Sequence, residues 1–323
     1  MKDCIKASAD YVPEDPNQRV NYPFGMVLGA ADFYQEQAHF EWKHRLGARL
    51  LQGYGTVCGL AVSAQATTGG TDVEIQVSPG YAISPQGRWI WVEHAQCGRL
   101  NDWLQQHKSD LSPPLASGRR QIYVTLGYAE CPTDLVPIAG RACALEEDTH
   151  KPSRIEESFQ LQFAWAPPPQ PYEYAMRSLV ELLRSISFVP AVGSPPLDDS
   201  ELLLALVREL GAVASPPSIF PPASIRINQD RAGEILSRLV TVLVTEVYPR
   251  LDPLQPTGSW EQDGALLLAT LAFEVDAGGA LVVQVDSQGE LLPGVVAIDE
   301  RNRPLLVADK LQQALAAGLP AHF

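Results

Sequence analysis

Hydrophobic and polar positions follow a helical rhythm between about residues 32 and 52. Asp32 suits the first turn of a helix, and Gly53 and Gly55 suit its end, because glycine accepts the left-handed backbone conformation there. An extended arm is expected over residues 1–20. The pattern predicts a strong helix with a buried face made of Phe33, Phe40, Leu46, Leu50 and Leu51.

Short segments in which apolar and polar residues alternate follow this helix, and they are typical of half-buried β-strands. Tight turns are expected at Ser78-Pro79-Gly80 and at Ser84-Pro85-Gln86-Gly87, with one or two helical turns over residues 100–107. The predicted strands cover residues 56–64, 72–77, 88–93, 121–128 and 154–165.

Three consecutive prolines divide the chain, because they continue neither a helix nor a strand ladder. We therefore predict a linker at residues 167–171, between a domain over 21–166 and a second domain over 172–323. The second domain should hold helices near 172–187, 199–210 and 231–248, a hairpin over 265–286, a short strand at 295–299 and a closing helix at 305–317. The fold class is α+β: an N-terminal helix packed on an antiparallel β-sheet, then a helical segment and a small C-terminal β-element with a closing helix.

Charge and cysteine content exclude several classes of protein. Among 323 residues, 24 are basic and 38 acidic, which gives a net charge of −14 and disfavours nucleic-acid binding. No apolar run is long enough to span a membrane, so no membrane insertion is expected. The five cysteines form no C-x-x-C pair and imply no disulfide framework; Cys131 and Cys143 flank one loop and would pair only in an exported protein. A cytoplasmic location fits best.

Motifs that carry chemistry are incomplete in this sequence. Residues 53–59 read GYGTVCG, which is one residue too long for a dinucleotide-binding fingerprint and follows a helix instead of a strand. Glu36 and His39 have di-iron spacing but lack the further ligands. His94 and Cys97 lack neighbours that would activate a thiol, and Glu146-Glu147-Asp148 lacks calcium-loop spacing. We therefore expect no catalytic residue, no metal site, no cofactor and no enzyme activity.

Aromatic residues are the better candidates for function. Trp89 and Trp91 are two positions apart, so both should lie on one side of a strand, as core residues, interface anchors or a sugar-binding platform. The candidate interface residues are Tyr34, Trp42, Tyr54, Trp89 and Trp91.

Several segments resemble a poorly characterised family encoded beside phage-tail-like contractile injection systems. The first group consists of residues 22–28 (YPFGMVL), 32–37 (DFYQEQ), 43–46 (KHRL) and 50–60 (LLQGYGTVCGL). The second consists of residues 77–83 (VSPGYAI), 87–90 (GRWI), 128–132 (YAECP) with Pro137, 154–159 (RIEESF), 268–270 (LAT) and 298–303 (IDERNR). Gln52 departs from the pattern, in which histidine is expected.

The resemblance implies a non-enzymatic structural component of a contractile particle, in its baseplate, fibre or cap region. Its partners would be other subunits of the particle, in a homo- or hetero-oligomer, and the particle would be released or membrane-associated. One alternative is a receptor- or glycan-binding fibre module that uses Trp89, Trp91 and Tyr54. Another is a particle-associated hydrolase, which would need Cys97, His94 and a carboxylate to converge in a pocket.

Overall fold

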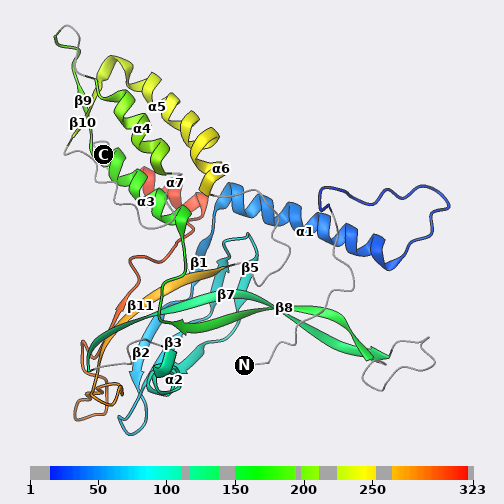
Figure 1. The fold of residues 1–323 in the computed structure, drawn as a ribbon, viewed down its shortest axis with the longest axis vertical. Helices are drawn as coiled ribbons and strands as arrows, with labels where there is room; N and C mark the ends of the chain where they lie inside the picture. The colour runs from blue at the N-terminus through cyan, green and yellow to red at the C-terminus, as the bar shows by residue number, and fades with distance from the viewer. Residues whose placement is uncertain are drawn as a thin grey trace. The chain divides into compact units, whose positions relative to one another are not determined.

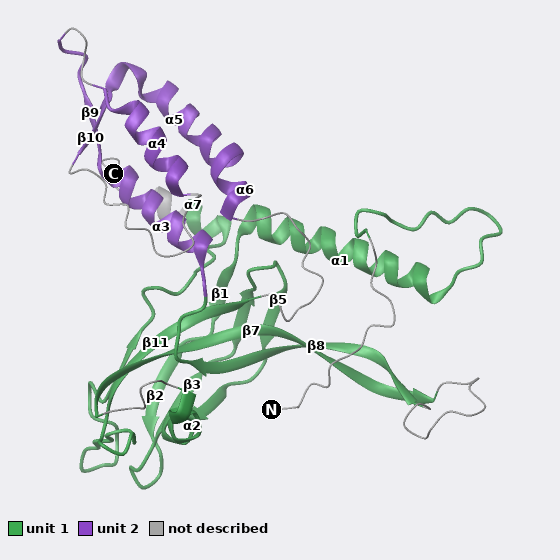
Figure 2. Ribbon diagram, viewed as in Figure 1, with its two compact units in different colours: residues 1–168, 257–323 green, residues 169–256 purple. Residues whose placement is uncertain are grey.

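The computed structural model describes residues 15–110, 117–137, 150–193, 198–210, 224–251 and 264–318. It confirms the α+β class, with antiparallel sheets, an N-terminal helix before the strands, and a C-terminal strand and helix. Figure 2 shows two units, one made of residues 1–168 and 257–323 and the other of residues 169–256. The division after Pro168 falls within the predicted linker. Residues 257–323 rejoin the first unit, however, and do not form one domain with residues 172–256 as we predicted.

The first unit contains two three-stranded antiparallel sheets that are continuous in sequence. One has the order β1 (Gly55–Gly59), β4 (Gly80–Ile83), β5 (Trp89–Val92), and the other β2 (Val62–Ala66), β3 (Val73–Val77), β6 (Gln96–Arg99). The chain passes from β1 into β2, from β3 into β4 and from β5 into β6. The two sheets are therefore one meander of three strands that bends sharply between its halves.

Glycines make this bend possible. Gly59 and Leu60 both have left-handed backbone angles, with φ of 65° and 59°, so the predicted strand over residues 56–64 is broken here. Across the bend Leu60 N donates to Pro79 O at 3.2 Å, and Gly59 is paired with Gly80. A Cβ atom on Gly59 would lie 2.1 Å from Pro79 O, and one on Gly80 would lie 2.3 Å from Cys58 O. The backbones approach too closely at this bend for any side chain.

A four-stranded antiparallel sheet completes the first unit (Figure 1). Its order is β12 (Val296–Asp299), β11 (Ala265–Val275), β7 (Gly118–Pro137), β8 (His150–Ala164). The predicted C-terminal β-element thus supplies the strand next to β7, with Ala265 opposite Gly127 and Val275 opposite Gly118. The helix α2 (Leu100–His107) packs on one side of the core of this unit and is followed by a 3₁₀ turn at Lys108–Asp110. The buried residues of this core include Ile75, Val77, Ile90, Val92, Leu104, Ile122, Val124, Leu126, Leu271 and Phe273.

Strands β7 and β8 continue beyond this core as a two-stranded arm. Strand β11 pairs with β7 only as far as Gly127, whereas β8 pairs with it up to Pro137 opposite His150. Leu135 and Ile155 in the outer part are exposed. Cys131 in the arm is disulfide-bonded; the sequence left its pairing open, and its partner is not among the described residues. Cys143 and the acidic cluster at 146–148 also lie outside them.

The first helix, α1 (Ala30–Gln52), is held to the unit by polar contacts. Arg49 Nη1 donates to Gln86 Oε1 at 2.8 Å, and Arg45 Nε donates to Gln86 O at 3.3 Å. The helix ends at Gly53, whose φ of 82° confirms the predicted helix stop. A Cβ atom on Gly87 would lie 2.3 Å from Arg45 O, so the turn before β5 lies directly against the helix.

The predicted buried face of α1 is wrong. Phe33, Phe40 and Leu51 are 53%, 62% and 87% exposed, and Leu46 and Leu50 are only half-buried. The side of α1 that faces the rest of the unit is instead polar, because the contacts made there are hydrogen bonds. Three of the five residues that we predicted to be buried therefore lie on the exposed side of the helix.

The chain before α1 folds back along this helix. Gln35 Nε2 donates to Asp15 O at 2.7 Å and to Gln18 O at 2.6 Å, and His39 Nδ1 lies 2.8 Å from Pro16 O. The hydroxyl of Tyr22 donates to Glu36. Residues 15–22 therefore lie against α1; the remainder of the predicted arm, residues 1–14, falls outside the described residues.

Phe40→Ala is expected to change the free energy of unfolding by less than about 1 kcal/mol, whereas a core phenylalanine would cost roughly 3–5 kcal/mol. The reason is that most of the ring is already in solvent. Chemical denaturation of dilute protein measures the difference. A loss of several kcal/mol would show that this ring is covered within the chain.

The second unit combines three main helices with two parallel strands. In chain order it contains α3 (Pro171–Arg184), β9 (Ile186–Val189), α4 (Ser200–Glu209), β10 (Ile225–Asn228), a 3₁₀ turn (Gln229–Arg231), α5 (Ala232–Val242), a π-helical turn (Leu243–Val247) and α6 (Tyr248–Leu251). The helices match the predicted ones, and the strands were not predicted. A separate core includes Leu182, Leu203, Leu204, Val207, Ile227 and Leu239. The closing helix, α7 (Asp309–Gly318), belongs to the first unit.

Candidate functional site

Three aromatic side chains form a strip on the outer face of β4 and β5. Ala82, Ile90 and Val92 alternate with them and point into the core, which leaves Tyr81, Trp89 and Trp91 in solvent. Tyr81 is paired with Trp91 across the two strands, and their rings stack at 5.9 Å between centroids with an angle of 5°. We call Tyr81, Trp89 and Trp91 the aromatic strip.

The aromatic strip lines a groove of about 280 Å³ together with Glu157 and Ser158 of β8. Flat aromatic faces beside a carboxylate suit the binding of a sugar ring or of an apolar side chain with a polar group. No histidine is among the described residues that line this groove. The arrangement is suited to binding.

A buried ion-pair network fixes the strip relative to α1. Arg88, next to Trp89, lies 2.8 Å from Glu41 of α1, contacts Glu130 of β7, and stands over the ring of Tyr128 at 4.7 Å. Burial alone would lower the pKa of Arg88, but Glu41 and Glu130 outweigh it and raise that pKa. Burial, and then Glu130, raise the pKa of Tyr128 above its ordinary value. The ion pairs of Arg88 therefore join the start of β5 to α1 and to β7.

A second exposed apolar surface lies on α1 and just before it. Residues 22–28 are all exposed, although five of them are large and apolar: Tyr22, Phe24, Met26, Val27 and Leu28. We call them the apolar segment. On α1 the exposed side chains of Phe33, Phe40 and Leu51 lie within about 20° of one another around the helix axis. Contiguous apolar surface of this kind is typical of protein contacts.

The five candidate interface residues do not form one cluster. Trp89 and Trp91 share the aromatic strip, as their spacing predicts. Tyr34 is exposed on α1, and Trp42 is half-buried with Lys43 Nζ 4.9 Å above its ring. Tyr54 is half-buried against the core of the first unit, which makes it a packing residue. The sequence reasoning missed Tyr81 because residues 78–80 were read as a turn; a strand placed at 80–83 would have set Tyr81 opposite Trp91.

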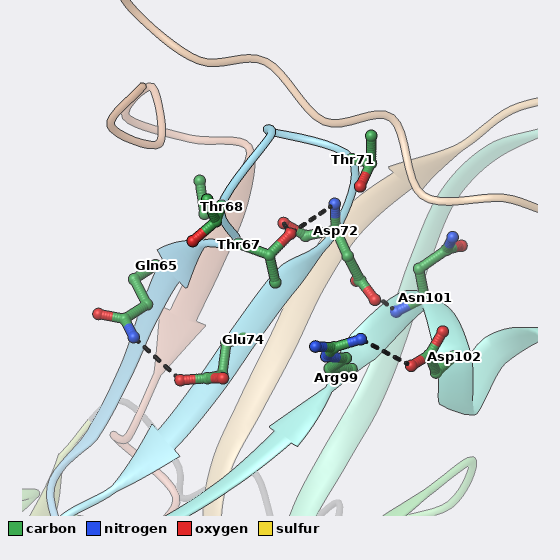
Figure 3. Close-up of a pocket in the computed structure, with 10 residues that line it drawn as sticks. Gln65, Thr67, Thr68, Thr71, Asp72, Glu74, Arg99, Asn101 and Asp102 are labelled. Atoms are coloured by element: carbon green, nitrogen blue, oxygen red, sulfur yellow. Dashed lines mark hydrogen bonds and ion pairs between the residues drawn. The ribbon is translucent and has the colours of Figure 1, made fainter. Parts of the chain in front are cut away.

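A larger polar pocket of about 400 Å³ lies between the β2–β3 turn, β6 and α2 (Figure 3). Asp72 Oδ1 accepts hydrogen bonds from Val73 N at 2.6 Å and Asn101 N at 2.8 Å, and so caps α2. Glu74 Oε1 accepts from Gln76 and Gln65, both at 2.9 Å, which holds the pKa of Glu74 below its ordinary value. These carboxylates stabilise the turn and the helix, and neither is poised as a general base.

The remaining chemical candidates have structural surroundings. Glu36 and His39 bind the chain before α1, and the described residues contain no group of three or more His, Cys, Asp or Glu that could hold a metal. Cys97 is a free, exposed thiol on β6, and His94 is exposed near it. Neither lines the groove or the polar pocket.

Two motifs far apart in the sequence meet at a buried arginine. Arg303 donates from Nε to Thr56 Oγ1 at 2.9 Å, from Nη2 to Gly59 O at 3.1 Å, and from Nη1 to Glu300 Oε1 at 3.0 Å. Thr56 N also donates to Pro304 O at 2.9 Å. Burial lowers the pKa of Arg303. Residues 55–59 and 300–304, which we call the arginine clasp, therefore join the start of β1 to the C-terminal part of the chain.

No family model matches the chain, and no curated protein is similar to it. None of the helices in the described parts of the chain has the length and apolar character needed to cross a membrane.

Proposed function

We propose that this protein is a non-enzymatic structural subunit that works through contacts with other subunits, in a phage-tail-like contractile injection particle. The observation that carries the proposal is the uncovered apolar surface made of the apolar segment and the outer side of α1. Most of these side chains have no neighbour that removes them from water. Burying apolar area stabilises an association by about 25 cal/mol per Å², so a partner surface would gain considerable free energy here.

The positions of the quoted motifs support this reading. Residues 22–28 and 32–37 belong to the resemblance to the contractile-system family, and they lie where the chain exposes apolar side chains. The motifs at 50–60 and 298–303 instead meet in the arginine clasp, where they have a folding role. These four motifs are thus assigned to surface contact or to folding.

The test is co-purification. The protein is expressed together with the products of the genes that neighbour its own, and the mixture is separated by size and inspected by electron microscopy. We expect it to elute with at least one of them as an assembly. Phe24→Ser/Val27→Ser should abolish co-elution, whereas Leu135→Ser in the β7–β8 arm serves as a matched exposed-apolar control. A protein that remains monomeric and binds none of these products would contradict the proposal.

A second candidate function, glycan or receptor binding, is favoured by the aromatic strip and its groove. If a sugar ring stacks on Trp91, the Trp91→Ala variant should bind the sugar at least tenfold more weakly than the wild type. The Trp103→Phe variant, which changes a ring packed against the core, should bind it as tightly as the wild type. Glycan-array binding followed by calorimetry on any hit measures this. An array without hits would remove this candidate.

A further inference from the structure

The outer side of α1 has the spacing of a helix–helix contact. Ala30, Phe33, Gln37, Phe40, His44, Gly47 and Leu51 follow one another at intervals of three or four residues, which keeps them on one side of the helix. All are exposed except Gly47, which is half-buried but would meet nothing within 4 Å if it carried a Cβ atom. We call these seven residues the outer stripe. Residues 15–18 bind Gln35 and His39 on the opposite side of the helix, and Tyr22 binds Glu36 at the edge of the stripe, whose own residues remain exposed.

We infer that the outer stripe binds the outer stripe of a second copy of this chain, with the two α1 helices antiparallel. This inference rests on the proposed function and names the partner of one of its surfaces. In the antiparallel register centred between Gln37 and Phe40, each residue of the stripe faces the stripe residue of the partner whose number adds to 77. The stripe is then self-complementary: Phe40 faces Gln37, Phe33 faces His44, and Ala30 faces Gly47, where two small residues allow close approach.

Charge selects the antiparallel orientation. Glu36 and Lys43 flank the stripe on the same side, and in the antiparallel pair Glu36 of each copy lies beside Lys43 of the other, which gives two opposite-charge pairs. A parallel pair would place Glu36 beside Glu41, and like charges in that position destabilise. Glu41 is in addition already paired with Arg88.

The contact between the two stripes is limited in length. Leu51 of one copy reaches beyond Ala30, where the partner helix begins. A stable dimer buries roughly 1,200–2,000 Å² in total, and a pair of helix stripes alone supplies less than this. The self-pairing is therefore expected to depend on concentration, and the apolar segment stays available to other subunits.

Sedimentation of the full-length protein tests the inference. The wild type is expected to be a concentration-dependent dimer, and Phe40→Glu should weaken it at least thirtyfold. Glu36→Lys and Lys43→Glu should each weaken it about tenfold, because each removes two pairs, and the double variant should recover to within about threefold of the wild type. Lys310→Glu on α7 is the matched control and should not change the dimer. Thermal unfolding checks that each variant is folded.

The relative orientation of the two α1 helices is tested separately, by measuring the distance between two spin labels. Each label is carried by a non-natural amino acid in place of Gln52, which avoids labelling the native cysteines. The antiparallel register places the two labels about 40 Å apart, whereas a parallel pair would place them about 10 Å apart. Any of three results would overturn the inference: a wild type that is monomeric at about 100 µM, a double variant that does not recover dimer affinity, or a distance of about 10 Å between the two labels. A monomer that still co-elutes with neighbouring gene products would overturn the self-pairing alone and leave the proposed function standing.

Discussion

Gly80→Ala is expected to lower the free energy of unfolding by roughly 4 kcal/mol or more, enough to abolish folding of a domain of ordinary stability. The new Cβ atom would lie 2.3 Å from Cys58 O, 2.7 Å from Leu60 N and 2.9 Å from Gly59 Cα. All three are backbone atoms, so no side-chain rotation relieves the contact. Relief requires the paired strands to separate at the bend, which breaks the hydrogen bond from Leu60 N to Pro79 O.

Denaturant unfolding followed by circular dichroism measures this loss. Gly233→Ala in α5 is the matched control, because a Cβ atom there meets nothing within 4 Å. Alanine is the better helix former, so the control should be unchanged or more stable by up to about 1 kcal/mol. Equal unfolding midpoints for Gly80→Ala and the wild type would mean that the bend is more open than described.

The second large effect is expected from Arg303→Met, which should destabilise the protein by about 3 kcal/mol. Arg303 is 6% exposed, and its replacement removes the hydrogen bonds to Thr56, Gly59 and Glu300 while keeping a similar side-chain length. The carbonyl of Gly59 and the hydroxyl of Thr56 then lose the donor that joined them to the C-terminal part of the chain. The burial of a charge offsets part of this loss, which is why the expected effect is not larger.

Arg301→Met, two residues earlier, provides the comparison. The Arg301 side chain is 88% exposed and pairs with Asp299 at 2.7 Å, so its removal should change stability far less than the removal of Arg303 does. Thermal and chemical unfolding of both variants compare the stability lost with a buried arginine to the stability lost with an exposed one. Similar losses in the two variants would show that the clasp contributes no more than an ordinary surface ion pair.

Local patterns in the sequence were enough to predict the helices and most core strands. Residues 73–77 alternate between apolar and polar side chains, and Gly53 marks the end of α1. The prediction failed where the determinants are tertiary. Strand β7 reaches Pro137 although the predicted strand ended at residue 128, because its outer part pairs with β8 alone. The parallel strands β9 and β10 have only four residues each, which is too short for a clear local signal, and β9 does not alternate.

The first helix shows a more general limit of periodicity. The recurrence of Phe33, Phe40 and Leu51 correctly indicates an apolar stripe, but a stripe does not say which surface covers it. Within the unit, α1 is anchored by Arg45, Arg49 and Glu41, whose partners Gln86 and Arg88 lie in a turn that is distant in sequence. A prediction that assumes an isolated chain assigns such a stripe to the core.

The candidate binding groove could be predicted only in part. The spacing of Trp89 and Trp91 places both rings on one side of β5, as found. Glu157 and Ser158 come from β8, and no local signal connects them to the two tryptophans. Their approach depends on the register of β8 on β7, which long-range packing sets.

The interruption of the first unit by residues 169–256 has a consequence for synthesis on the ribosome. Strand β11 forms the inner neighbour of β7, yet it is translated after the entire second unit. Until it arrives, residues 118–127 present an open strand edge and half of an apolar core. The second unit is continuous and can fold as soon as it emerges, whereas the first must wait for the end of translation. The nascent chain therefore passes through a long aggregation-prone interval, in which we expect chaperones to determine its yield.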